Sequence, residues 1–121
     1  MRQFTHINAR TMAEAISALQ RYGDRANIIA GGTDILGKMK DAILPRYPEA
    51  LIDIKNVAGL DFLKEEKGVL RIGALTRLED IGKEPLIREK YTALAQAAGR
   101  TASPHLREMG TIGGNLCQDI R

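Results

Sequence analysis

The sequence predicts an α+β protein made of two small subdomains that both mix helix and strand, the second of them incomplete. Within residues 1–56, short apolar runs alternate with a helical pattern in βαβ order, whereas residues 57–121 carry a hairpin pattern followed by helical segments. The 121 residues are 44% hydrophobic and 27% charged, which is the balance of an ordinary globular protein. We therefore expect two folding subregions with a boundary after residue 56.

The first subdomain opens with an extended segment at residues 3–8 and an amphipathic helix. Thr11 and Glu14 stand at the spacing of a capping box, in which a hydroxyl and a carboxylate accept hydrogen bonds from the first free amides of a helix. Apolar residues follow at helical spacing, and Gly23 suits the C-cap. This pattern predicts a helix between Thr11 and Gly23.

The rest of this subdomain is predicted as strand, glycine turn, helix and strand. Residues 28–30 form an apolar run suited to a buried strand, and residues 35–40 can start a helical segment. Pro45 and Pro48 exclude regular structure before the next strand candidate at residues 50–54.

The second subdomain begins with a predicted hairpin. Residues 60–64 and 69–74 are strand candidates, and Glu65–Gly68 is the expected turn between them. A second capping box, formed by Thr76 and Glu79, is expected to open a short helix.

The end of the chain is predicted as one further helix and a loop. Apolar residues near helical spacing indicate a helix over residues 87–99, which Gly99 ends. Residues 100–121 are predicted to be mostly loop-like, because Pro104 and three glycines interrupt them.

Charge and composition argue against several classes of function. The net charge is +3, and the halves 1–60 (8 − 6) and 61–121 (10 − 9) carry +2 and +1, so no basic block indicates a nucleic-acid binder. No apolar stretch approaches the ~18 residues of a membrane span and no secretory signal is visible, which makes the cytoplasm the expected location. The single Cys117 and two isolated histidines offer no metal-ligand spacing.

The first glycine-rich segment is Ala30-Gly31-Gly32-Thr33-Asp34, directly after an apolar strand candidate. Paired glycines let a backbone approach a ligand closely and can direct successive N–H groups at an anion. Thr33 adds a hydroxyl donor. The segment matches neither the Rossmann fingerprint nor the P-loop. It therefore suits a phosphate cradle, and the alternative is a plain tight turn between strand and helix.

The second glycine-rich segment, Gly110-Thr111-Ile112-Gly113-Gly114-Asn115, repeats these ingredients. Asn tolerates the left-handed conformation that such turns use. Two such segments in one short chain suggest a ligand with more than one phosphate. The alternative for this segment is a flexible surface loop.

Four motifs in order resemble a known family: residues 30–34, 70–76, 102–107 and 110–115. In them the chain resembles the N-terminal part of the FAD-binding subunit of molybdenum-containing hydroxylases, the family of xanthine dehydrogenase and carbon monoxide dehydrogenase. Residues 115–121 are most similar to the 4-hydroxybenzoyl-CoA reductase branch. The resemblance extends over essentially the whole chain.

The resemblance implies the FAD-binding fold of the molybdenum hydroxylase and vanillyl-alcohol oxidase type, in which two subdomains bind FAD between them. It implies that residues 30–34 offer backbone N–H groups and the Thr33 hydroxyl to the FAD pyrophosphate, and that residues 111–115 hold the pyrophosphate and ribityl region. The cofactor-binding residues expected from it are Ile29, Ala30, Gly31, Gly32, Thr33, Asp34, Ile35, Thr101, Thr111, Ile112, Gly113, Gly114, Asn115 and Asp119.

The function implied by the resemblance is electron transfer by a flavoprotein subunit of an oxidoreductase. The flavin passes electrons between iron–sulfur clusters and an external acceptor or donor. A molybdopterin-binding large subunit and an iron–sulfur small subunit are the implied partners. No catalytic residue and no metal ligand are expected in this chain, which alone is expected to be inactive. The alternative is a truncated, non-catalytic module that binds partner subunits without flavin.

Overall fold

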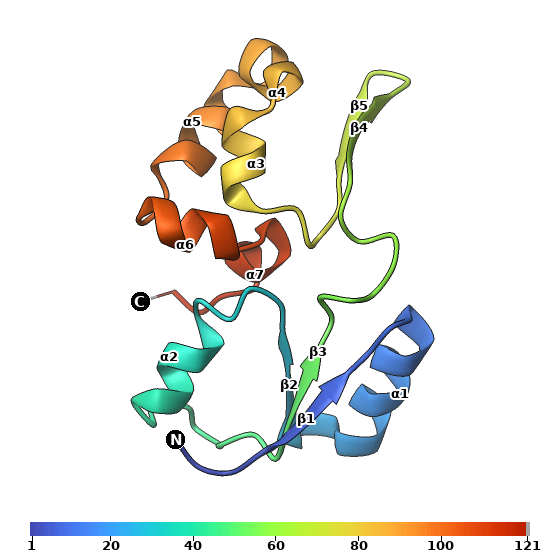
Figure 1. Cartoon of the computed structure of the whole chain (residues 1–121), viewed down its shortest axis with the longest axis vertical. Helices are drawn as coiled ribbons and strands as arrows, with labels where there is room; N and C mark the ends of the chain where they lie inside the picture. Colours follow the sequence, from blue (N-terminus) through green and yellow to red (C-terminus); the bar gives the residue numbers. More distant parts are fainter. Residues whose placement is uncertain (121) are drawn as a thin grey trace. The chain divides into compact units, whose positions relative to one another are not determined.

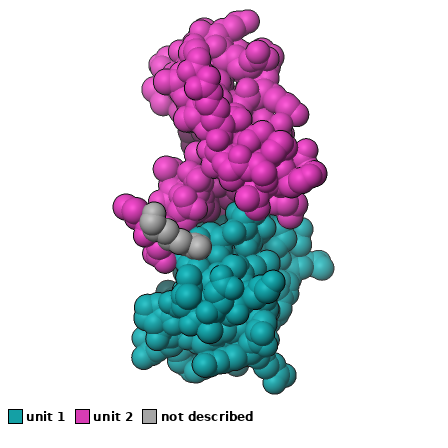
Figure 2. Space-filling model, turned by 90° about the vertical axis from the view of Figure 1, so that its left-hand side faces the viewer, with its two compact units in different colours: residues 1–59 teal, residues 60–121 magenta. Residues whose placement is uncertain are grey.

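The computed structural model describes residues 1–120 and contains both helices and strands, which confirms the α+β class. Its contacts divide the chain into two compact units, residues 1–59 and residues 60–121 (Figure 2). This division follows Gly59, whereas the sequence suggested a boundary after residue 56. Each unit has its own sheet and its own helices, so each is described by itself.

Unit 1 is built on a three-stranded parallel sheet with the order β1-β3-β2 (Figure 1). The strands are β1 (Thr5–Asn8), β2 (Ala26–Ile29) and β3 (Ala50–Asp53), and every residue of the central strand β3 is buried. Helix α1 (Met12–Tyr22) and helix α2 (Ile35–Lys40) cover opposite faces of the sheet. Because both faces are covered, β3 has the apolar sequence of a buried parallel strand.

Helix α1 has the N-cap Thr11 and the C-cap Gly23 that the sequence predicts, but Glu14 bonds the amide of Arg10 rather than that of the N-cap. The Thr11 hydroxyl accepts from the Glu14 amide at 3.1 Å, and the Glu14 carboxylate accepts from the Arg10 amide at 2.7 Å. Gly23 ends the helix at φ +56° and opens the 3₁₀ turn η1 (Gly23–Arg25). A positive φ favours glycine, which explains the residue at this position.

The core of unit 1 lies between α2 and the sheet. Ile35 and Met39 of α2 pack with Ile29 and Leu51, and Phe4, Leu44 and Tyr47 close its border. The strand predicted as buried at residues 28–30 differs from β2 in two respects, since β2 ends at Ile29 and Ile28 is 47% exposed. The reason is that β2 is an edge strand.

Unit 2 begins with the antiparallel hairpin of β4 (Leu63–Glu66) and β5 (Val69–Ile72). Its turn is shorter than predicted, because Glu65 and Glu66 pair with β5 and only Lys67 and Gly68 connect the strands. Both connecting residues have positive φ, +50° and +77°. This is the backbone of a two-residue type I′ turn, whose twist matches that of the strands.

Five short helices complete unit 2: α3 (Leu78–Lys83), α4 (Pro85–Lys90), α5 (Thr92–Arg100), α6 (Pro104–Met109) and α7 (Ile112–Leu116). Their core contains Ile81, Ile87, Ala95 and Ala98, with Leu63, Leu70, Ile72, Tyr91, Leu94 and Ile112 packed against it.

Three predictions for unit 2 were wrong. Thr76 does not cap α3, because its hydroxyl donates to the Phe62 carbonyl at 2.9 Å and the helix begins after Arg77. The helix expected over residues 87–99 is divided at Tyr91, which leaves helical geometry. Residues 104–109 and 112–116 are helices rather than loop.

Candidate functional site

The first glycine turn connects the end of β2 to α2. Gly32 has φ +78°, and a Cβ at this position would lie 3.0 Å from Leu36 Cδ1 and 3.3 Å from Ile29 Cδ1. The positive φ strains any other residue, and the approach to Leu36 leaves little room for a side chain. The turn therefore favours glycine at position 32 through its backbone conformation, and a larger residue would also require the Leu36 side chain to shift.

Three consecutive amides of this turn have no acceptor among residues 1–120: those of Gly31, Gly32 and Thr33. The parallel ladder ends just before them, where the Ile54 amide donates to the Ile29 carbonyl at 3.1 Å. Successive open N–H groups form a concavity that favours an anion. This is the arrangement that a phosphate cradle needs.

The residues that flank these amides have structural contacts. Ile29 and Ile35 belong to the core of unit 1, so their side chains are directed into the protein. The Asp34 carboxylate lies 2.7 Å from the Lys38 ammonium, one turn along α2. Of the residues predicted here, Gly31, Gly32 and Thr33 therefore offer the open donors.

A polar cluster that sequence reasoning missed lies at the carboxyl end of the same sheet. The buried Asp53 carboxylate accepts from the Lys55 amide at 2.9 Å, and its other oxygen lies 2.7 Å from Lys55 Nζ and 3.2 Å from His6 Nε2. Burial raises the pKa of the Asp53 carboxyl, but the contacts with Lys55 and His6 outweigh it and the pKa falls below its ordinary value of 3.8. The one available signal was an Asp two residues before a Lys at the end of a strand.

Most of the second glycine segment forms the start of helix α7, and all its amides except that of Thr111 donate to acceptors within residues 1–120. Ile112 N–H donates to the Thr76 carbonyl and Gly113 N–H to the Ala74 carbonyl, both at 2.9 Å. The amides of Gly114 and Asn115 donate to the Thr111 hydroxyl and carbonyl, at 3.2 Å and 2.9 Å. Thr111 is itself buried, as the N-cap of α7.

Close packing against Ala74 explains why position 113 is glycine. A Cβ there would lie 2.9 Å from both Cβ and O of Ala74, although Gly113 does not have a positive φ. The two glycine segments resemble each other in sequence, yet the first leaves three amides open, whereas five of the six amides of the second have acceptors within unit 2.

Thr101 lies at the end of α5, and its hydroxyl donates to the Ala97 carbonyl at 2.8 Å. The Arg107 guanidinium donates to the carbonyls of Thr101 and Ala102, at 3.0 Å and 3.3 Å, and Ala102 has φ +47°. A non-glycine residue at positive φ costs free energy and needs surrounding contacts to hold it. Asp119 follows α7 on the exposed surface.

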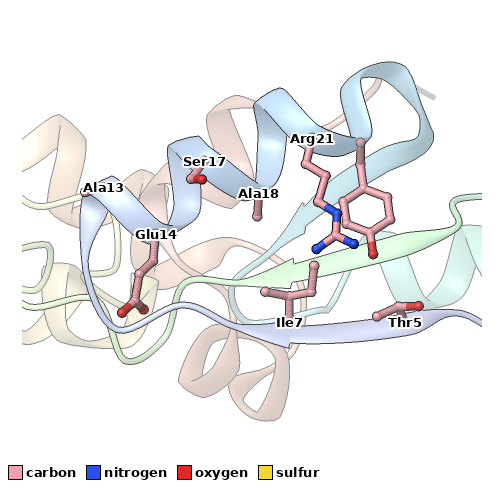
Figure 3. A pocket seen from close by; sticks show the side chains of 8 residues that line it. Thr5, Ile7, Ala13, Glu14, Ser17, Ala18 and Arg21 are labelled. Atoms are coloured by element: carbon pink, nitrogen blue, oxygen red, sulfur yellow. The ribbon is translucent and has the colours of Figure 1, made fainter.

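A separate groove in unit 1 lies between α1 and β1 (Figure 3). Ile7 of β1 forms its floor, and Glu14 and Arg21 lie along α1 above it. None of the residues predicted to bind the cofactor lines this groove.

No group of three or more His, Cys, Asp or Glu side chains within residues 1–120 could hold a metal ion. No helix within the described part of the chain is long and apolar enough to cross a membrane.

Solved structures define the class to which this fold belongs. Carbon monoxide dehydrogenase from Hydrogenophaga pseudoflava, in a form that lacks the Mo-pyranopterin moiety of the molybdenum cofactor, matches with a TM-score of 0.90 and 34% identity. The match covers 95% of this chain and 39% of the matched chain. Quinoline 2-oxidoreductase from Pseudomonas putida 86 matches with a TM-score of 0.87 and 27% identity, over 95% and 39% of the two chains. The fold is therefore one found in molybdenum-containing oxidoreductases.

The chain belongs to the family described as FAD binding domain in molybdopterin dehydrogenase, whose model matches residues 2–121. Among its relatives is the FAD-binding subunit of an aldehyde oxidoreductase from Escherichia coli K12, 41% identical over 100% of this chain and 37% of the relative. The nicotinate dehydrogenase FAD-subunit of Eubacterium barkeri is 38% identical over 96% of this chain and 39% of the relative.

The chain thus spans about two fifths of the length of these curated relatives. The predicted resemblance to the flavin subunits of molybdenum hydroxylases is confirmed. The finer likeness to the 4-hydroxybenzoyl-CoA reductase branch stays a prediction.

Proposed function

We propose that this chain binds FAD through its first glycine turn and serves as the flavin-carrying part of a molybdenum hydroxylase-type oxidoreductase. The observation that carries the proposal is the row of three open amides at Gly31, Gly32 and Thr33, at the carboxyl end of a parallel sheet. Ligands of open parallel sheets bind at this end of the strands. Membership in the FAD-binding family names the ligand.

The residues of this turn would hold the diphosphate of FAD through hydrogen bonds to its oxygens. The three N–H groups and the Thr33 hydroxyl are the donors, and Gly32 supplies the conformation that presents them. When bound, the flavin accepts and releases electrons, and the protein contributes position and electrostatics.

Residues 111–115 would contact the same cofactor in another way, because four of their five amides already have acceptors within unit 2. We assign that contact to the partly exposed side chain of Asn115, whose amide group has two donors and an acceptor. Thr101 and Asp119 stay predicted contacts with the flavin and its chain.

The electron-transfer role requires an electron source outside this chain. No cluster of acidic, histidine or cysteine side chains over residues 1–120 could hold a metal. We propose that the protein works with a molybdopterin-binding subunit and an iron–sulfur subunit, because the chain belongs to the family of the FAD binding domain in molybdopterin dehydrogenase. Purification from the native host tests this proposal. A protein that emerges alone, carries flavin and oxidises an organic substrate by itself would overturn it.

A matched pair of glycine variants tests the flavin site. The chain is incubated with FAD and desalted, and bound flavin is read from its absorbance near ~450 nm. We expect stoichiometric flavin with the wild type and with Gly37→Ala, because a Cβ at Gly37 meets nothing within 4 Å. Gly32→Ala should lose at least about tenfold in affinity, because alanine resists a φ of +78°. Equal binding by both variants would contradict the assignment.

A further inference from the structure

The first open amide of the glycine turn belongs to the peptide that joins Ala30 to Gly31. The carbonyl of this peptide accepts from Lys55 Nζ at 3.3 Å, whereas its N–H has no acceptor within residues 1–120. In a trans peptide the C=O and the N–H point in opposite directions, and the chain contains no cis peptide among these residues. Whatever fixes the Ala30 oxygen therefore fixes the direction of the Gly31 N–H.

Lys55 is itself held in place by Asp53. Its ammonium lies 2.7 Å from one carboxylate oxygen, and its own backbone N–H donates to the other at 2.9 Å. His6 Nε2 lies 3.2 Å from the oxygen that the ammonium uses. The Asp53 side chain is 8% exposed and the Lys55 side chain 47% exposed. The carboxylate is thus a buried anchor, and the lysine extends from it to the turn.

Two physical consequences follow for the Gly31 amide. An ammonium that donates to a carbonyl polarises the whole peptide, which makes the N–H of the same peptide a stronger donor. The contact also restrains rotation of the peptide plane, so the N–H points away from Lys55. Because Asp53 neutralises much of the lysine charge, orientation contributes more here than bare attraction.

From these contacts we propose that Lys55 is a positioning residue of the glycine turn, which orients the Gly31 N–H toward an anionic diphosphate. The proposal rests on the proposed function of this turn. It adds a side chain to a site that otherwise consists of backbone groups and the Thr33 hydroxyl. It also gives the Asp53 and Lys55 pair a role beyond the stability of unit 1.

Three variants of the whole chain test the proposal. Lys55→Met removes the ammonium and keeps the length of the side chain, whereas Lys55→Arg keeps a donor that can reach a carboxylate and a carbonyl. Lys40→Met is the matched control, because Lys40 is exposed at the end of α2. The first measurement is the backbone amide spectrum of the ligand-free, ¹⁵N-labelled proteins. Outside the substituted residue and its neighbours, we expect the largest change in Lys55→Met at Gly31, with an unchanged core and a lower Tm, because the buried Asp53 carboxylate loses its ammonium partner.

The second measurement is the affinity for two probes, FAD and ADP, which share a diphosphate. Lys55→Met should raise both dissociation constants roughly tenfold, while Lys55→Arg returns to within about threefold of the wild type and Lys40→Met matches it. The tenfold ratio should persist between about 0.05 M and 0.5 M salt, because an oriented hydrogen bond is screened much less than a surface charge.

The outcomes separate this proposal from the function on which it rests. If the wild type binds and Lys55→Met binds equally well, or if the ratio disappears at high salt, Lys55 is no positioning residue. An unmoved Gly31 amide in Lys55→Met overturns the proposal without reference to any ligand. If the wild type binds neither probe, the proposed function falls and the role of Lys55 toward a ligand falls with it.

Discussion

Arg107 Nε donates a hydrogen bond to Glu79 Oε2 at 3.0 Å, and the two side chains are only 14% and 17% exposed. The bond joins α6 to α3. The same guanidinium holds the carbonyls of Thr101 and Ala102 at the end of α5. One arginine therefore ties three helices of unit 2 together and supports the positive φ of Ala102.

We expect Arg107→Lys to destabilise unit 2, because an ammonium cannot replace the planar fork of a guanidinium that bonds one carboxylate and two carbonyls. The midpoint of thermal unfolding should fall by roughly 5 °C. Arg88→Lys is the control, since the Arg88 side chain is exposed on α4 and has no ion pair with any described residue. An unchanged midpoint in Arg107→Lys would show that these bonds contribute nothing.

Gly113→Ala should destabilise the protein in the absence of any ligand. The added Cβ would lie 2.9 Å from the Cβ and carbonyl oxygen of Ala74, so the backbone must move, at a cost of about 1–3 kcal/mol. Urea unfolding measures the change. Gly99→Ala is the matched control, because a Cβ there meets nothing within 4 Å and alanine favours a helix. If Gly113 were needed only to let a ligand approach the backbone, Gly113→Ala would leave the free energy of unfolding unchanged.

Asp53 should make the stability of the protein depend on pH at the acid end. Because its folded-state pKa lies below 3.8, the ionised carboxylate stabilises the fold above that pH. This stability is lost as the pH falls through the folded-state pKa. Asp53→Asn should therefore lower Tm at pH 7 and approach the wild-type Tm as the pH falls below 3.8. A gap between the two proteins that stays constant down to about pH 2.5 would contradict this.

Lys67→Asn should stabilise the hairpin of unit 2. Lys67 sits at φ +50° before Gly68, and Asn tolerates this region better than Lys. We expect a gain of up to about 1 kcal/mol in the free energy of unfolding. The control Lys64→Asn changes an exposed lysine within the β4 strand and should not stabilise. A loss of stability in Lys67→Asn would mean that the backbone of this turn has another conformation than the type I′ turn.

The fold of unit 1 could be predicted because its signals are local. Thr11 and Glu14 begin α1, and Gly23 ends it, as their spacing indicates. The signals in unit 2 were overridden by tertiary contacts. Thr76 stands in a capping box, yet its hydroxyl is taken by the Phe62 carbonyl of a distant segment. No pattern within four residues reports a contact across fourteen positions.

Of the candidate site, the sequence predicts the local turns but not the contacts between distant segments. The glycine turn at Gly31 and Gly32 was predicted, because paired glycines after an apolar strand suit a phosphate cradle or a plain tight turn. The start of α7 was predicted as a second cradle, since Gly113 and Gly114 look alike in sequence. Its amides are taken by Ala74 and Thr111, and only the folded chain brings Ala74 to them.

We propose that the three open amides of the first glycine turn hold the diphosphate of FAD. An NMR titration of the ¹⁵N-labelled chain with FAD, repeated with ADP, tests it most directly. We expect the amide resonances of Gly31, Gly32 and Thr33 to shift together and to reach saturation at one dissociation constant. Saturable binding that leaves the resonances of these three amides unshifted would contradict this assignment. So would the absence of binding by either ligand.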